Sequence, residues 1–152
     1  MDIKQISNEN ARIIPDTWHY PDQYAFYDLQ ADPEDYQEII DPLARKDCYF
    51  QVTKDHHLVG YFVVDGTSDV LDIGLGLRPD LTGQGFGEIY WNQIFVYIRN
   101  HYTAPKIRLA AAEFNVRAQK LYAKVGFKET RRFLQTTNGG QYPFIEMERE
   151  LS

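Results

Sequence analysis

The chain has 152 residues, enough for one domain with a single hydrophobic core. Its hydrophobic content of 43% excludes a disordered chain, and its net charge of −6 argues mildly against nucleic acid as the ligand. No apolar stretch approaches membrane-spanning length, the N-terminus lacks the layout of a signal peptide, and the single cysteine, Cys48, fits a reducing compartment. We therefore expect one cytoplasmic domain over residues 1–152, with no nucleic-acid or membrane partner.

The first half of the chain mixes helix and strand patterns. Asp32-Pro33-Glu34 has the N-cap, the proline and the acidic first turn of a helix start. The aromatic residues between positions 18 and 27 either shape a pocket or form core, and we favour core. In chain order we expect a strand at 3–6, a helix at 8–17 disturbed by Pro15, a helix from Asp32 to about Ala44, and hairpin strands at 48–54 and 58–65 joined by Asp55-His56-His57.

The second half contains a strand–helix–strand crossover and a final hairpin. Alternating apolar residues predict a strand at 71–77, and apolar residues at helical spacing from Tyr90 to Tyr102 predict a long helix after it. A strand at 106–112, a helix at 115–125 and strands at about 128–136 and 141–148 follow, the last two joined by Asn138-Gly139-Gly140. This combination predicts a single α/β (α+β) domain with a mixed sheet.

The loop Thr82-Gly83-Gln84-Gly85-Phe86-Gly87 lies between that strand and the long helix. Glycines leave the backbone open to a ligand, and the start of a helix favours an anion such as a pyrophosphate. The loop is either such an anion site or an ordinary tight turn. It fits neither a dinucleotide fingerprint, because Glu88 stands where glycine is needed, nor a P-loop, because no Gly-Lys-Ser or Gly-Lys-Thr occurs.

A second motif runs from Asn115 to Phe127, Asn-Val-Arg-Ala-Gln-Lys-Leu-Tyr-Ala-Lys-Val-Gly-Phe. Asn115 is a good N-cap, and Gly126 suits the left-handed end of a helix. The two motifs, in this order, resemble those of the GNAT N-acetyltransferases: the acyl-coenzyme A signature of Gln or Arg, two variable residues, Gly, one variable residue, and Gly or Ala, followed by Asn, Arg-Ala, Leu-Tyr and Gly-Phe. Thr82 departs from the usual Gln or Arg, which puts one side-chain contact to the pyrophosphate in doubt.

The resemblance implies a GNAT-like fold, with a mostly antiparallel sheet of about seven strands, about four flanking helices and a splayed strand pair that holds acyl-CoA. Acetyl-CoA would be the co-substrate, and no metal ion is expected. Arg78 is a further candidate for coenzyme phosphates. The residues implied in coenzyme binding are Leu75, Gly76 and Leu77 through the backbone, Thr82, Gly83, Gln84, Gly85, Phe86 and Gly87 around the pyrophosphate, and Asn115 and Lys120.

Catalytic roles follow from the same resemblance. Tyr122 aligns with the general acid that protonates the departing thiolate, and a backbone N–H near Leu75 would stabilise the oxyanion. Asp72 is the candidate general base, with Glu113 or water as alternatives. Three histidines are weaker candidates: His19 for the acceptor pocket, and His56 and His57, which we expect to be solvated.

The sequence thus predicts an acetyl-CoA-dependent N-acetyltransferase that acts by direct transfer in a ternary complex. The acceptor would be a small-molecule amine or a protein amine, and a homodimer is compatible with the fold. The alternative is a non-catalytic acyl-CoA-binding sensor or regulatory module on the same fold. A Rossmann-type oxidoreductase lacks the required glycine at position 88.

Overall fold

Alternating apolar residues build a seven-stranded sheet in the computed structural model, which covers residues 1–152. The strand order is β1-β2-β3-β4-β5-β7-β6, with β4 and β5 parallel and with β1–β2, β2–β3 and β5–β7 antiparallel. The strands are β1 (Asp2–Gln5), β2 (Tyr49–Lys54), β3 (His57–Gly66), β4 (Val70–Leu77), β5 (Lys106–Ala112), β6 (Lys128–Thr137) and β7 (Gly140–Glu150). The predicted mixed sheet is confirmed.

Five α-helices and three short 3-10 helices connect the strands. No helix is both long enough and apolar enough to cross a membrane. The α-helices are α1 (Asn8–Thr17), α2 (Pro33–Ile40), α3 (Pro42–Arg45), α4 (Gly87–His101) and α5 (Val116–Lys124), and the 3-10 helices are η1 (Asp22–Tyr27), η2 (Leu29–Ala31) and η3 (Pro79–Leu81).

The predicted helix from Asp32 to about Ala44 is wrong in its extent, because the chain breaks between α2 and α3. Proline cannot donate a helical hydrogen bond and disfavours helical angles in the residue before it. Asp41, which precedes Pro42, is extended, and its carboxylate caps α3 by accepting from the Leu43 N–H at 3.0 Å. Pro15, in contrast, lies in the last turn of α1 without ending that helix.

The chain packs as two compact units, and β3 and β4 each run from one unit into the other. Unit 1 comprises Met1–Val63, Leu75–Leu81 and Thr136–Gly140, and unit 2 comprises Val64–Gly74, Thr82–Gln135 and Gln141–Ser152.

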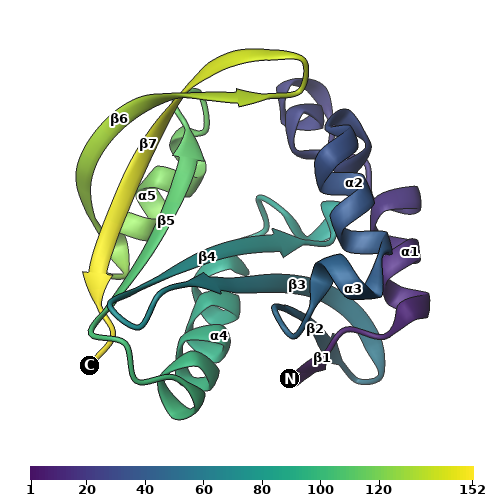
Figure 1. Cartoon of the computed structure of the whole chain (residues 1–152), viewed down its shortest axis with the longest axis horizontal. Coiled ribbons are helices and arrows are strands. Elements are labelled where there is room, and N and C mark those ends of the chain that lie inside the picture. The colour runs from purple at the N-terminus through teal and green to yellow at the C-terminus, as the bar shows by residue number, and fades with distance from the viewer. The chain divides into compact units, whose positions relative to one another are not determined.

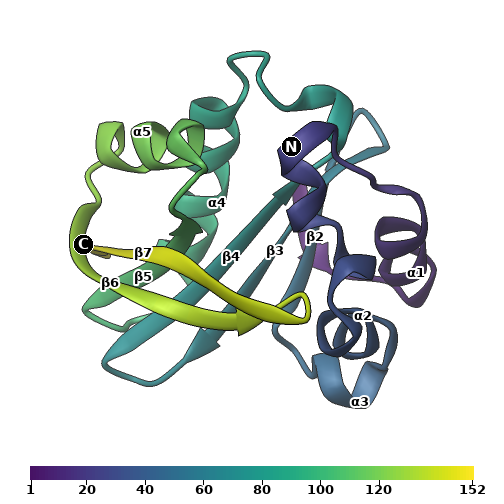
Figure 2. The same ribbon diagram turned by 90° about the horizontal axis from the view of Figure 1, so that it is seen from above.

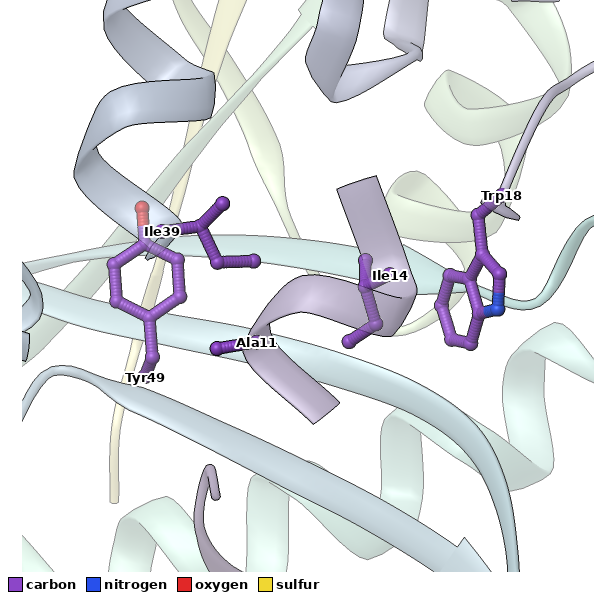
Figure 3. Packing of buried hydrophobic residues seen from close by; sticks show 5 residues of the cluster. All are labelled: Ala11, Ile14, Trp18, Ile39 and Tyr49. Carbon is purple, nitrogen blue, oxygen red and sulfur yellow. The ribbon is translucent and has the colours of Figure 1, made fainter. Parts of the chain in front are cut away.

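In unit 1 the helices α1, α2 and α3 gather beside β1 and β2 (Figure 1). Figure 3 shows the core cluster between them. Of the aromatic residues at 18–27, Trp18 is buried in this core, whereas Tyr20, Tyr24, Phe26 and Tyr27 are only half-buried, so the core interpretation holds for Trp18 alone. The cluster consists of Ala11, Ile14, Trp18, Ile39 and Tyr49.

In unit 2 the helices α4 and α5 lie on the same side of β5 and β7 (Figure 2). The apolar stripe of α4 supplies Trp91, Ile94 and Ile98, all fully buried. Phe127, which follows α5, packs edge-on against Trp91, with ring centroids 5.3 Å apart. Burial of these large side chains supplies the main stabilisation of this unit, at about 1.5–3 kcal/mol for each fully buried side chain.

The parallel ladder between β4 and β5 is short. It pairs Val70 with Lys106, Leu71 with Ile107 and Asp72 with Arg108. These are the first three residues of each strand, while β4 continues to Leu77. The backbone groups of Leu75 to Leu77 therefore lie outside this ladder.

Candidate active site

The glycine loop between β4 and α4 adopts a conformation that requires glycine at two positions. Gly83 and Gly85 have φ angles of +70° and +76°, in the left-handed region that other residues rarely adopt. Gly83, Gln84 and Gly85 are exposed. A Cβ at Gly85 would meet nothing within 4 Å, so the backbone conformation, and not crowding, demands glycine there.

The loop leads directly into the first turn of α4. Phe86, at the N-cap position, makes no side-chain capping bond to the helix start. Its ring stacks instead on Tyr90, with centroids 6.1 Å apart. Because a helix start carries unpaired N–H donors and a partial positive charge, this end of α4 suits an anion.

Helix α5 packs against this turn. A Cβ at Gly87 would lie 3.0 Å from Leu121, so glycine lets the two helices approach closely. Asn115 is the predicted N-cap, and its side-chain oxygen accepts from the Ala118 N–H at 3.1 Å. Gln119, which sequence reasoning missed, donates to the carbonyls of Ala112 (3.2 Å) and Glu113 (2.9 Å) and so holds the loop that presents Asn115.

Tyr122 lies on α5, and no residue of that helix is fully buried. Its ring packs edge-on against Phe127, with centroids 5.8 Å apart. The side chain is half-buried, as are Ala118 and Leu121 on the same stripe. A tyrosine that only packed the core would be buried, so this environment leaves room for the predicted catalytic role.

Asp72, the candidate base, forms a two-pronged ion pair with Arg108 on β5. Arg108 donates from Nε and Nη2 to the two carboxylate oxygens at 2.6 and 3.0 Å. This bond, with the nearby charges of Asp72, Glu146 and Glu148, raises the pKa of Arg108. Both oxygens of Asp72 are therefore engaged, and Asp72 can accept a proton only by giving up part of this pair.

The predicted pantetheine-binding end of β4 belongs to unit 1, where two tyrosines contact it. A Cβ at Gly76 would overlap the ring of Tyr61, so this position accepts only glycine without rearrangement. The Tyr20 hydroxyl donates to the Leu77 carbonyl at 2.7 Å, and burial raises the pKa of Tyr20. Both contacts fix the backbone of Gly76 and Leu77, and neither was foreseen from the sequence.

Several weaker candidates have structural partners. Arg78 binds both carboxylate oxygens of Asp80, at 2.6 and 3.2 Å, and donates to the Leu58 carbonyl at 3.1 Å, so its guanidinium is engaged within unit 1. Glu113 lies 3.9 Å from Arg132.

His19 pairs with the Asp28 carboxylate at 3.0 Å, and His56 is an exposed turn residue with φ of +67°. Lys120 is exposed on α5.

Asp32 ties the β6–β7 turn to the start of α2. Its carboxylate accepts from the Thr137 hydroxyl at 2.6 Å and from the Asn138 N–H at 3.3 Å, and it also caps α2 through the Glu34 N–H at 2.9 Å. The hydrogen bond from Thr137 is the main reason that the pKa of Asp32 is lowered. The Asn138 side chain donates to the Phe26 carbonyl at 2.8 Å, which fixes the turn a second time.

A group of carboxylates follows along α2. Glu34, Asp35 and Glu38 are exposed by surface area, but the Asp35 carboxylate is partly desolvated by its surroundings. This burial, followed by the charges of Asp32, Glu38 and Glu34, raises the pKa of Asp35 to about 6. Glu38 accepts a hydrogen bond from the Tyr49 hydroxyl at 3.0 Å. Unit 1 therefore presents a strongly anionic surface on this helix.

The family of the chain follows from a comparison with family models. Residues 6–127 match the model of the Acetyltransferase (GNAT) family, so the chain belongs to that family. It is an N-acetyltransferase with acetyl-CoA as its co-substrate. A search of curated protein sequences found no significant match.

Solved structures show the same fold at low sequence identity. A spermidine N-acetyltransferase from Vibrio cholerae, in complex with CoA and spermine, is 17% identical, with a TM-score of 0.75 over 99% of this chain and 95% of that one. A GNAT-family acetyltransferase from Bacillus anthracis is 12% identical, with a TM-score of 0.72 over 98% of this chain and 93% of that one. The fold is thus shared over nearly the whole length.

Proposed function

We propose that this acetyltransferase moves the acetyl group directly from acetyl-CoA to a cationic amine in a ternary complex. The observation that supports acetyl-CoA as the acetyl donor is the exposed glycine loop. In this loop Gly83 and Gly85 have left-handed backbone angles just before the uncapped start of α4. Such a backbone suits the pyrophosphate of a coenzyme. The GNAT match over residues 6–127 supports the same ligand.

The proposed transfer uses one side chain, one backbone N–H and solvent. The acceptor nitrogen attacks the thioester carbonyl, and the carbon–sulfur bond breaks as the tetrahedral intermediate collapses. The Tyr122 hydroxyl gives its proton to the departing thiolate, and a backbone N–H near Leu75 stabilises the oxyanion. Because Arg108 engages both oxygens of Asp72, we propose that solvent, and not this carboxylate, takes the proton lost by the acceptor.

The acceptor is proposed to be a small polyamine or a similar cation. The carboxylates of α2 and the net charge of −6 favour a positively charged ligand. The V. cholerae relative was solved with spermine, which supports the same chemical class. Asp35 is the carboxylate that we assign to acceptor recognition, because its surroundings keep it partly desolvated and so strengthen its attraction for a cation.

Replacing Asp35 with asparagine is expected to raise the KM for spermidine about three- to tenfold at pH 8 and to change it little at pH 5. The raised pKa of about 6 means that the wild-type carboxyl is already neutral at pH 5. An attraction of about 1 kcal/mol corresponds to this range of KM. Comparing variant with wild type at each pH cancels the titration of the acceptor amine itself.

The same substitution should stabilise the folded protein at pH 8. Since the folded pKa of Asp35 lies above the usual value of about 3.9, the folded state binds the proton more tightly. The protonated Asp35 carboxyl therefore makes its full favourable contribution to the free energy of unfolding below pH about 4. This contribution is lost as the pH rises through about 6. Asp35→Asn should raise the thermal midpoint at pH 8, whereas Asp47→Asn, the same charge change at an exposed site, should alter neither KM nor midpoint. An unchanged KM at pH 8 would remove Asp35 from acceptor recognition.

Acetyl-CoA is expected to raise the thermal midpoint by several degrees, and NADH is expected to leave it unchanged. A ligand at about 100 times its Kd stabilises the folded state by about 2.7 kcal/mol. For a domain of this size, each kcal/mol shifts the midpoint by roughly 2–4 °C. Thermal unfolding followed with each ligand measures the effect, and equal shifts with the two ligands would contradict the coenzyme assignment.

A further inference from the structure

Helix α5 presents a basic edge to the glycine loop and to the first turn of α4. A Cβ on Gly83 would lie 3.0 Å from the Arg117 guanidinium, and a Cβ on Gly87 would lie 3.0 Å from Leu121. One turn further on, Lys124 contacts Glu88 at 2.8 Å. These three α5 residues have the i, i+4, i+7 spacing of one helix face. The contacts therefore fix the register of α5 along the loop and set the Arg117 guanidinium beside Gly83.

The charges along this edge are arranged for an anion at the loop. Glu88, which would repel an anion bound at the start of α4, is paired with Lys124, and that contact raises the pKa of Lys124. Arg117 then adds positive charge beside the exposed segment Gly83 to Gly85. The loop itself contributes no basic side chain, because position 82 is threonine.

We propose that Arg117 binds the diphosphate of the coenzyme and supplies the positive charge that Thr82 does not. This inference rests on the coenzyme site proposed above. A guanidinium can donate two parallel hydrogen bonds to phosphate oxygens and keeps its charge at any working pH. The diphosphate, and not the ribose 3′-phosphate, is assigned because Arg117 adjoins a glycine whose left-handed backbone belongs to the anion-binding turn.

The test is isothermal titration of the full chain with CoA and with 3′-dephospho-CoA, which keeps the diphosphate. Arg117→Gln is expected to raise Kd about tenfold for both ligands, a loss of about 1.4 kcal/mol. The Kd values of Arg117→Lys should lie between those of Arg117→Gln and the wild type. Lysine restores the positive charge but cannot donate the two parallel hydrogen bonds of a guanidinium. Arg12→Gln changes the net charge equally at an exposed residue of α1 and should leave both Kd values unchanged.

A second substitution tests directly whether Arg117 supplies the positive charge that Thr82 does not. Thr82→Arg, introduced into the Arg117→Gln chain, is expected to recover most of the lost affinity, while the apo thermal midpoints show that each variant remains folded. Unchanged affinity in a folded Arg117→Gln variant would overturn the inference and leave the proposed function intact. A loss confined to CoA would also overturn it, because it would place Arg117 at the 3′-phosphate. A wild-type chain that binds neither ligand would overturn the proposed function as well.

Discussion

Replacing Tyr122 with phenylalanine is expected to lower kcat by at least about 100-fold and to change the Kd of CoA by less than about twofold. Positioned general acids contribute roughly 10²–10⁴-fold to a reaction rate. Phenylalanine keeps the ring that packs on Phe127 and loses only the hydroxyl. Because Tyr122 is half-buried, removal of the hydroxyl should not unfold α5.

Tyr97→Phe is the matched control for this experiment. Tyr97 is also a half-buried tyrosine on a helix of unit 2, and its ring stacks on His101 with centroids 3.9 Å apart. The kcat of Tyr97→Phe should equal that of the wild type. Initial rates at saturating acetyl-CoA, together with CoA titrations, separate the two parameters. Normal turnover in Tyr122→Phe would remove the acid role, and a large rise in Kd would make Tyr122 a binding residue instead.

Local signals in the sequence are sufficient for most of the fold and for the conformation of the glycine loop. Strand alternation, the Asn115 cap and the glycine spacing each depend on residues close together in the chain, and the structure confirms the cap and the left-handed angles at Gly83 and Gly85. The Asp41-Pro42 break is equally local, since it repeats the Asp-Pro signal that begins the helix at Asp32-Pro33. The apolar pattern continues across this break, which favours one continuous helix.

Contacts between distant residues could not be predicted in this way. The Tyr20 hydroxyl meets a carbonyl 57 positions away, and Arg108 meets a carboxylate 36 positions away. The charge of Asp72 was visible in the sequence, but its partner depends on the parallel register of β4 and β5. That register is set by tertiary packing, so the sequence alone does not reveal the ion pair that engages this candidate base.

The sequence alone does not single out Arg117 among the basic residues of the second motif. Arg117 is one residue of the pattern from Asn115 to Phe127, in which the resemblance implies a coenzyme contact for Lys120. Which of these two residues lies beside the glycine loop depends on the register of α5, and the contacts of Leu121 and Lys124 fix that register. Sequence spacing alone allows either residue to lie beside the loop.

The release of free thiol from acetyl-CoA should depend on an added amine acceptor. With spermidine or spermine we expect turnover on the order of 10 s⁻¹, a typical value for enzymes, and only background hydrolysis without an acceptor. Direct transfer requires the amine to be present before the carbon–sulfur bond breaks. Each thiol released should therefore be matched by one N-acetyl group on the amine.

Simultaneous measurement of free thiol and acetylated amine, across a panel of polyamines, monoamines and peptides, tests the central claim most directly. Direct transfer by this acetyltransferase predicts equal amounts of the two products and a preference for polyamines as acceptors. Tyr122→Phe should release little free thiol. Binding of acetyl-CoA without acetylation of any acceptor in the panel would contradict it and would favour a non-catalytic acyl-CoA sensor.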